Sequence, residues 1–114
     1  MEAPRKVQVG PFSYDLDISE QAGDRAKLAE QDARTVGHSD HSTQQLEVCA
    51  RQGPDQVADT VLHEVLHAVW STAGLHTGPA SEHEEHVVAS CTPLLLDTLR
   101  RNPVLVAYLT ATDA

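Results

Sequence analysis

Basic side chains are scarce in this chain. Its 114 residues include 8 Lys and Arg against 17 Asp and Glu, so the formal net charge is −9. Binding to a phosphate backbone or to an anionic membrane surface generally requires a basic patch. We therefore expect no nucleic-acid partner and no membrane partner, and we attribute most of the negative charge to solubility.

Aromatic residues and long apolar runs are also few. The aromatic residues are Phe12, Tyr14, Trp70 and Tyr108, so the core must consist mostly of Val, Leu and Ala. No apolar run approaches the roughly 18 residues that cross a bilayer. Residues 1–10 lack the apolar run and the cleavage pattern of a signal peptide. We therefore expect a soluble, cytoplasmic protein.

Cysteine is nearly absent as well. Cys49 and Cys91 are the two cysteines, and they form neither a C-x-x-C pair nor a zinc-finger spacing. The sequence leaves a disulfide between them open, but it favours two reduced, buried side chains that act as small apolar residues.

The first half of the chain predicts strands. Apolar residues mostly alternate with polar ones over residues 12–18, and residues 45–50 show the same pattern over a shorter stretch. Between them, residues 19–34 suit either a short helix or a long loop. Residues 37–42 (Gly-His-Ser-Asp-His-Ser) have the composition of a turn or loop.

The second half predicts helices. A helix should begin at Gly53-Pro54-Asp55, because proline suits its first position, and it should end near Gly74. A second helix should run from about Glu82 to Arg101, with Ser81 and Glu84 as a capping box and with a kink or a local rearrangement at Pro93. Residues 104–109 suit a short helix or a strand.

The most informative motif lies in the first of these helices. Residues 63–67 read His-Glu-Val-Leu-His, which is an H-E-x-x-H pattern. Two histidines four residues apart lie on one helix face, so His63 and His67 can bind one metal ion. Glu64 then lies beside the metal, where it can take a proton from a water molecule that the metal activates. This pattern predicts a zinc hydrolase site.

A catalytic zinc ion usually takes three protein ligands, so a third must come from elsewhere. The metzincin pattern would require Gly and His where this chain has Trp70 and Ala73, which excludes that class. The acidic start of the second helix is a better source. Its candidate ligands are Glu82, Glu84 and Glu85.

Helical spacing orders these candidates. One stripe on the second helix is expected to face inward, and it comprises Val88, Cys91, Leu95 and Leu99. Glu84 and Glu85 adjoin this stripe, whereas Glu82 is expected at the surface. We favour Glu85 as the third metal ligand, with Glu84 a close second. His38 and His41 are interpreted as solvated loop residues.

These motifs resemble a family. Residues 60–69 are similar to the metal-binding helix of small zincin-like metallopeptidases, and the chain more closely resembles short phage-encoded metallopeptidases. The shared features are an N-terminal strand, a short strand before the H-E-x-x-H helix, and a second helix that opens with E-E-x-V-V (residues 84–88) and ends at Asn102-Pro103. The resemblance implies a gluzincin-type site with Glu85 as the third ligand. Pro93 departs from the pattern.

We therefore predict a single α+β domain over residues 1–114, with a small twisted sheet packed against two helices that hold Zn²⁺. The predicted function is zinc-dependent hydrolysis of peptide bonds in a peptide or protein substrate, with Glu64 as the general base. The strand over residues 44–50 could bind an extended peptide at the sheet edge. The alternative is a non-catalytic, zinc-stabilised interaction or regulatory protein. A third hypothesis is a regulatory peptidase that cleaves one partner.

Overall fold

The computed structural model describes residues 1–112 and confirms an α+β fold. Its four strands form one sheet in the order β1-β2-β4-β3. The central strands β2 and β4 are parallel, and each outer strand is antiparallel to its neighbour. The strands are β1 (Lys6–Val9), β2 (Phe12–Ser19), β3 (Gly37–Asp40) and β4 (Gln45–Cys49).

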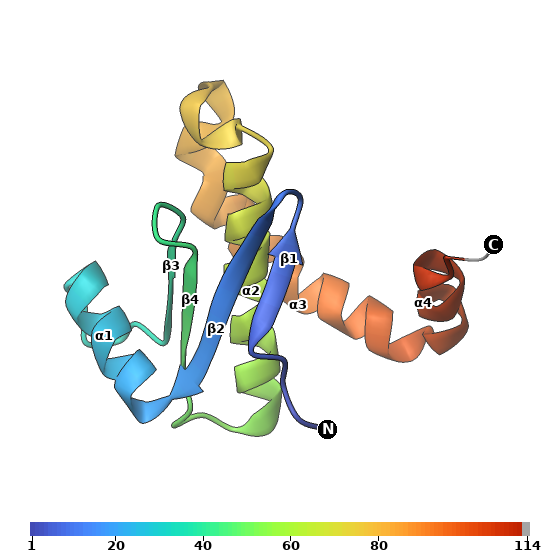
Figure 1. Ribbon diagram of the computed structural model, residues 1–114, viewed down its shortest axis with the longest axis horizontal. Helices are drawn as coiled ribbons and strands as arrows, with labels where there is room; N and C mark the ends of the chain where they lie inside the picture. Colours follow the sequence, from blue (N-terminus) through green and yellow to red (C-terminus); the bar gives the residue numbers. More distant parts are fainter. Residues whose placement is uncertain (113–114) are drawn as a thin grey trace.

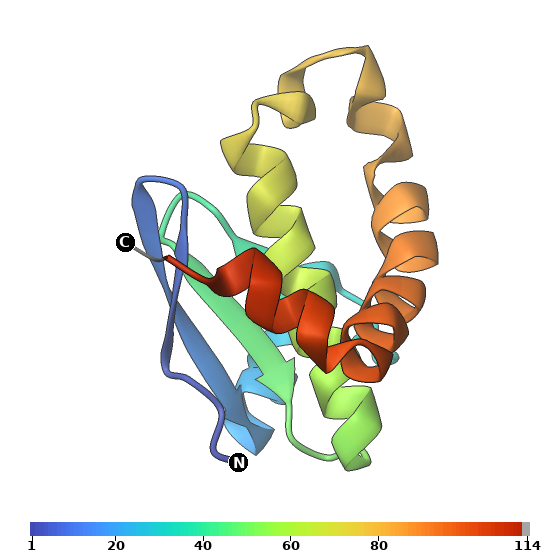
Figure 2. The same cartoon turned by 90° about the vertical axis from the view of Figure 1, so that its right-hand side faces the viewer.

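One helix follows β2 in the chain, and the remaining helices follow β4 (Figure 1). Figure 2 shows α2 lying between the sheet and α3, and it shows α4 at the far end of α3. No helix within residues 1–112 is long and apolar enough to cross a bilayer. The helices are α1 (Glu20–Glu30), α2 (Pro54–Thr72), α3 (Glu84–Arg101) and α4 (Pro103–Thr110), with the 3-10 turns η1 (Leu75–Thr77) and η2 (Pro79–His83) between α2 and α3.

Strand alternation assigns the two faces of the sheet to different helices. On one face, apolar side chains of the strands pack against Ala68 of α2 and form the main core. On the other face, Arg25 of α1 binds Asp17 of β2 and Glu47 of β4. Successive residues of a strand point to opposite faces, so β2 and β4 can contact α2 on one face of the sheet and α1 on the other. The buried strand residues of the core are Val9, Tyr14, Leu16, Leu46 and Val48.

Most of the segment over residues 19–34, which suited either a helix or a loop, forms helix α1. The Ser19 hydroxyl caps it by accepting a hydrogen bond from the Ala22 backbone N–H at 2.9 Å. Ala22 and Ala26 are fully buried, so small residues let α1 lie close to the sheet. Gln31 ends the helix in the left-handed conformation.

The prediction of a turn over residues 37–42 is wrong for its first four residues, which form strand β3. The composition of this segment favours a turn, but its antiparallel partner β4 supplies backbone hydrogen bonds that make it a strand. Local sequence does not reveal such a partner. The prediction of an edge strand at residues 44–50 is also wrong. Strand β4 is internal, since it pairs with β2 on one side and with β3 on the other. The edge strands are β1 and β3, and α2 contacts both.

Helix α2 spans the predicted range, and Gly74 follows it in the left-handed conformation. Helix α3 begins at Glu84, two residues later than predicted, because the 3-10 turn η2 occupies the preceding residues. The predicted capping box is therefore wrong, and no side chain caps this helix. Pro93 lies inside α3 without ending it.

The predicted inward stripe of α3 is only partly correct. Val88 is buried, but the next buried position is Thr92, whose hydroxyl donates to the Val88 carbonyl oxygen at 2.6 Å. Cys91 and Leu95 are exposed. Cys49 is buried and both cysteines are free, so the expected burial holds for Cys49 and is wrong for Cys91.

Candidate metal centre

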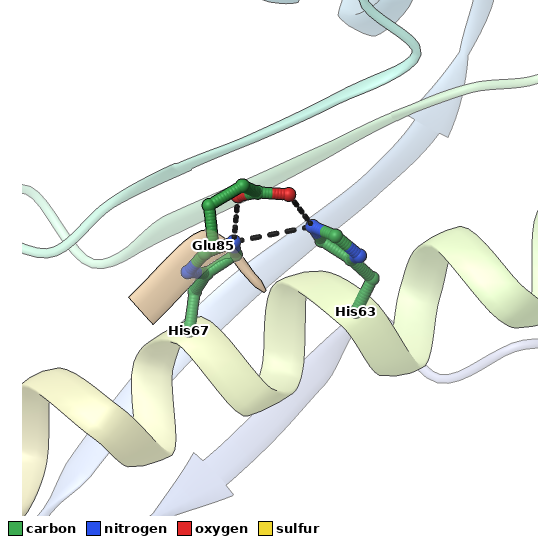
Figure 3. Close-up of side chains that lie close together, drawn as sticks. All are labelled: His63, His67 and Glu85. Atoms are coloured by element: carbon green, nitrogen blue, oxygen red, sulfur yellow. Dashed lines mark hydrogen bonds and ion pairs between the residues drawn. The ribbon is translucent and has the colours of Figure 1, made fainter. Parts of the chain in front are cut away.

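His63, His67 and Glu85 converge on one point between α2 and α3 (Figure 3). The two Nε2 atoms of the histidines lie 3.1 Å apart. The Glu85 carboxylate spans them, with one oxygen 2.9 Å from Nε2 of His67 and the other 3.1 Å from Nε2 of His63. One turn of α2 and the first turn of α3 thus supply all three groups.

These spacings fit a transition-metal ion. Zinc binds histidine nitrogen and carboxylate oxygen at about 2.0–2.1 Å, which places neighbouring ligand atoms of a tetrahedral site roughly 3.3 Å apart. The two Nε2 atoms lie 3.1 Å apart, and they lie 2.9 and 3.1 Å from different oxygens of Glu85. A small shift of these side chains would direct both nitrogens and one carboxylate oxygen at a single ion. Two imidazoles and one carboxylate are a donor set that zinc accepts, and three protein ligands leave a fourth position open.

Glu84 contacts the same histidine from its other side. Its carboxylate oxygen lies 2.6 Å from Nδ1 of His67. An ionised carboxylate only accepts hydrogen bonds, so Nδ1 of His67 donates to Glu84. If Nε2 gives up its own proton to a metal ion, this hydrogen bond would hold the ring in the orientation that directs Nε2 at the metal. The two adjacent glutamates therefore bind opposite nitrogens of one ring, and Glu85 reaches the candidate metal position.

The pKa of His67 reflects these carboxylates. Burial of the ring opposes its protonation, but the hydrogen bond to Glu84 and the charges of Glu64, Glu85 and Glu84 outweigh burial and raise the pKa above its ordinary value. A positive charge is thus favoured where the two rings and the carboxylates meet. A divalent cation would satisfy the same negative field.

Glu64 is buried beside this cluster, with 6% of its surface exposed. Ser39 of β3 donates a hydrogen bond to its carboxylate at 2.5 Å. Burial raises the pKa of Glu64, while the Ser39 hydrogen bond and the nearby imidazoles oppose the rise. A raised pKa makes this carboxylate a stronger proton acceptor than an exposed glutamate.

The glycine of β3 makes room for this carboxylate. A Cβ atom added at Gly37 would lie 2.6 Å from a carboxylate oxygen of Glu64 and 2.7 Å from Cγ2 of Thr60. The register of β3 with β4 places Gly37 and Ser39 on the same face as the core, toward α2. Gly37 thus leaves space for the Glu64 carboxylate, and Ser39 holds that carboxylate through a hydrogen bond.

A cavity of about 660 Å³ joins these groups. It extends from the His63 and Glu85 cluster along β3 toward the end of α1. Its volume is within the usual range for ligand sites. The cavity gives Glu64 and the candidate metal position a shared opening to solvent.

His41 also lines this cavity, and sequence reasoning missed it. Its Nδ1 lies 3.2 Å from the hydroxyl of the buried Tyr14, and burial lowers its pKa, which favours a neutral ring. The polar composition of residues 37–42 suggested a solvated loop, and only the long-range contact with Tyr14 reveals the pocket position. By contrast, His38 faces away and binds Glu30, and Glu82 is exposed as expected.

No protein-family model, no curated protein and no solved structure matches this chain. The resemblance to zincin-like metallopeptidases therefore remains an interpretation of its motifs. The geometry of the site carries the functional argument.

Proposed function

We propose that this protein is a zinc-dependent metallopeptidase that hydrolyses peptide bonds, with a zincin-like arrangement of its sheet and two metal-holding helices. The observation that carries the proposal is the convergence of His63, His67 and Glu85 within 4.8 Å of one another, next to a buried glutamate that opens into the same cavity. A structural zinc site would more often be closed by four protein ligands.

His63, His67 and Glu85 would hold the zinc ion, and Glu84 would fix the orientation of the His67 ring. A bound zinc ion would lower the pKa of a water molecule and polarise the scissile carbonyl. Glu64 would accept the proton from that water and later return it to the leaving amine. Ser39 would keep the Glu64 carboxylate in position through its 2.5 Å hydrogen bond.

Strand β3 is the natural place for an extended substrate. Within the described residues it pairs only with β4, so its other edge is available for strand addition by a peptide. The cavity runs along this edge and ends at the cluster, which would bring a peptide bond to the metal. His41 would face that peptide as a neutral hydrogen-bonding group.

The first experiment measures zinc by elemental analysis in protein purified without a metal-binding tag. We expect one zinc ion per chain in the wild type and in Glu82→Ala, a matched control from the exposed 3-10 turn. His63→Ala and Glu85→Ala should lose the metal. Absence of zinc from the wild type, even after zinc addition, would contradict the proposal.

The second experiment separates hydrolysis from a purely structural use of zinc. Glu64→Gln should keep the zinc ion, because Glu64 is not among the converging ligands. Its cleavage of a peptide library, followed by mass spectrometry, should fall about 100- to 10,000-fold, the usual contribution of a general base. Equal cleavage by wild type and Glu64→Gln would contradict the role of Glu64 as the general base. Zinc binding without any cleavage product would contradict hydrolysis of generic peptides and would support either the non-catalytic alternative or a peptidase that cleaves one partner.

A further inference from the structure

The C-terminal helix leaves an apolar stripe without a partner. Val104, Leu105, Tyr108 and Leu109 are 81%, 41%, 78% and 62% exposed. Residues four apart lie on one helix face, so the pairs 104/108 and 105/109 form a single stripe. Figure 1 shows α4 at the end of α3, away from α2 and the sheet. We call these four residues the arm surface.

The whole chain exposes more surface than a monomer of its size should. A compact 12.3 kDa protein is expected to expose about 6,100 Å², whereas this chain exposes 7626 Å². Its radius of gyration is 14.5 Å, against about 13.3 Å for a compact chain of this length. The surplus of roughly 1,500 Å² lies in the range that each partner of an obligate homodimer buries.

Charge restricts where a second copy could dock. The chain carries a formal charge of −9, yet residues 102–112 contain no charged side chain. Two such acidic chains repel each other over most of their surfaces, so an uncharged apolar helix is where they can meet at least electrostatic cost. Anionic lipid is a poorer occupant, because α4 itself carries no basic residue.

We propose that this protein forms a homodimer through α4, with the arm surfaces of two copies packed against each other. A two-fold arrangement lets the same stripe serve both partners. The apolar stripe then leaves water. The catalytic cavities are built from α2, α3 and β3 of one copy and do not depend on this contact.

The test is sedimentation velocity across a range of micromolar concentrations. The wild type should sediment at twice the chain mass. The double variant Val104→Glu/Tyr108→Glu should sediment as a monomer, with unchanged far-ultraviolet circular dichroism, because both side chains are exposed. The control is Leu28→Glu, which introduces one of the same acidic side chains at a leucine on α1 that is 79% exposed, and it should remain a dimer.

A monomeric wild type throughout that range would overturn the proposal, and so would a double variant that remains dimeric. Dissociation of Leu28→Glu would also overturn it, because the effect would then reflect added charge rather than the arm surface. Amide hydrogen exchange gives a test without any substitution. Exchange in residues 103–110 should slow as the wild-type concentration rises, and concentration-independent exchange would count against the dimer.

Discussion

Two adjacent glutamates at the start of α3 have different roles at the residue scale. Glu85 contacts the Nε2 atoms of His63 and His67, whereas Glu84 contacts Nδ1 of His67. A carboxylate bound to the outer nitrogen of a metal-ligating imidazole fixes the ring and its tautomer, and makes the ring a better donor. The pair therefore offers a direct comparison between a proposed ligand and the group that would orient a ligand.

We predict that Glu84→Gln weakens zinc affinity about 10- to 100-fold, the usual effect of losing such a partner. Glu85→Gln should weaken it further, because one of three ligands loses its charge. Glu82→Gln is the control, since that side chain is exposed and precedes α3. Competition with a chelating dye measures the three affinities. Identical affinities for the Glu84→Gln variant and the wild type would remove Glu84 from the site.

Helical spacing alone could not have made this distinction. The sequence placed Glu84 and Glu85 beside the same expected stripe, and that stripe was partly wrong because Thr92, rather than Cys91, is the buried position. The H-E-x-x-H histidines were easier to predict, since their spacing within one helix fixes their relation. The contact of Glu84 with His67 depends on how α2 and α3 pack, which no local pattern encodes.

At the scale of elements, strand β3 supports the site more than its sequence suggests. Gly37 leaves space for Glu64, and Ser39 donates to it. A side chain at Gly37 would have to displace the Glu64 carboxylate or the Thr60 methyl group, or move β3 away from α2. The strand and the helix are therefore matched at this single glycine.

We predict that Gly37→Ala destabilises the fold by about 1–3 kcal/mol, the usual cost of overpacking a well-filled site. It should also lower hydrolysis by moving Glu64. Gly78→Ala is the matched control, because a Cβ atom there meets nothing within 4 Å and its φ of −108° is ordinary. Urea unfolding gives both free energies. If the two variants are equally stable, the close contact at Gly37 is not a constraint.

The sequence predicted helix α2, whose apolar periodicity is strong, and missed strand β3, whose residues show no such periodicity. Helix α2 has proline at its start, a broad apolar face and a terminal glycine, so its limits were clear. Strand β3 reads Gly-His-Ser-Asp, and these residue types favour turns. It exists as a strand because β4 offers a free edge with matching register. That pairing is a tertiary effect.

At the scale of the whole molecule, α3 is held to the rest of the fold by few buried side chains. Only Val88 and Thr92 of α3 are buried within the described residues. The acidic first turn of α3 approaches α2 at His63 and His67. A zinc ion there would link α2 to a helix that buries few of its own side chains, and it would offset part of the charge of −9.

We therefore predict that zinc stabilises the whole fold. Free zinc at about 1,000 times its dissociation constant adds about 4 kcal/mol to the free energy of unfolding. Each kcal/mol shifts Tm by roughly 4 °C in a chain of this size, so removal by a chelator should lower Tm by roughly 15 °C. Differential scanning calorimetry with and without the chelator measures the shift.

His63→Ala supplies the control for this prediction, because it lacks one ligand while its side chain lies at the cavity rather than in the main core. Its Tm should not respond to the chelator. The loss of zinc should also be local at first, since the metal would link α3 to α2 while the sheet core lies on the other side of α2 (Figure 2). As the chelator removes zinc, the rate of amide exchange should therefore rise in residues 84–101 before it rises in β4. A uniform rise through both elements would mean that the metal does not hold α3 in place.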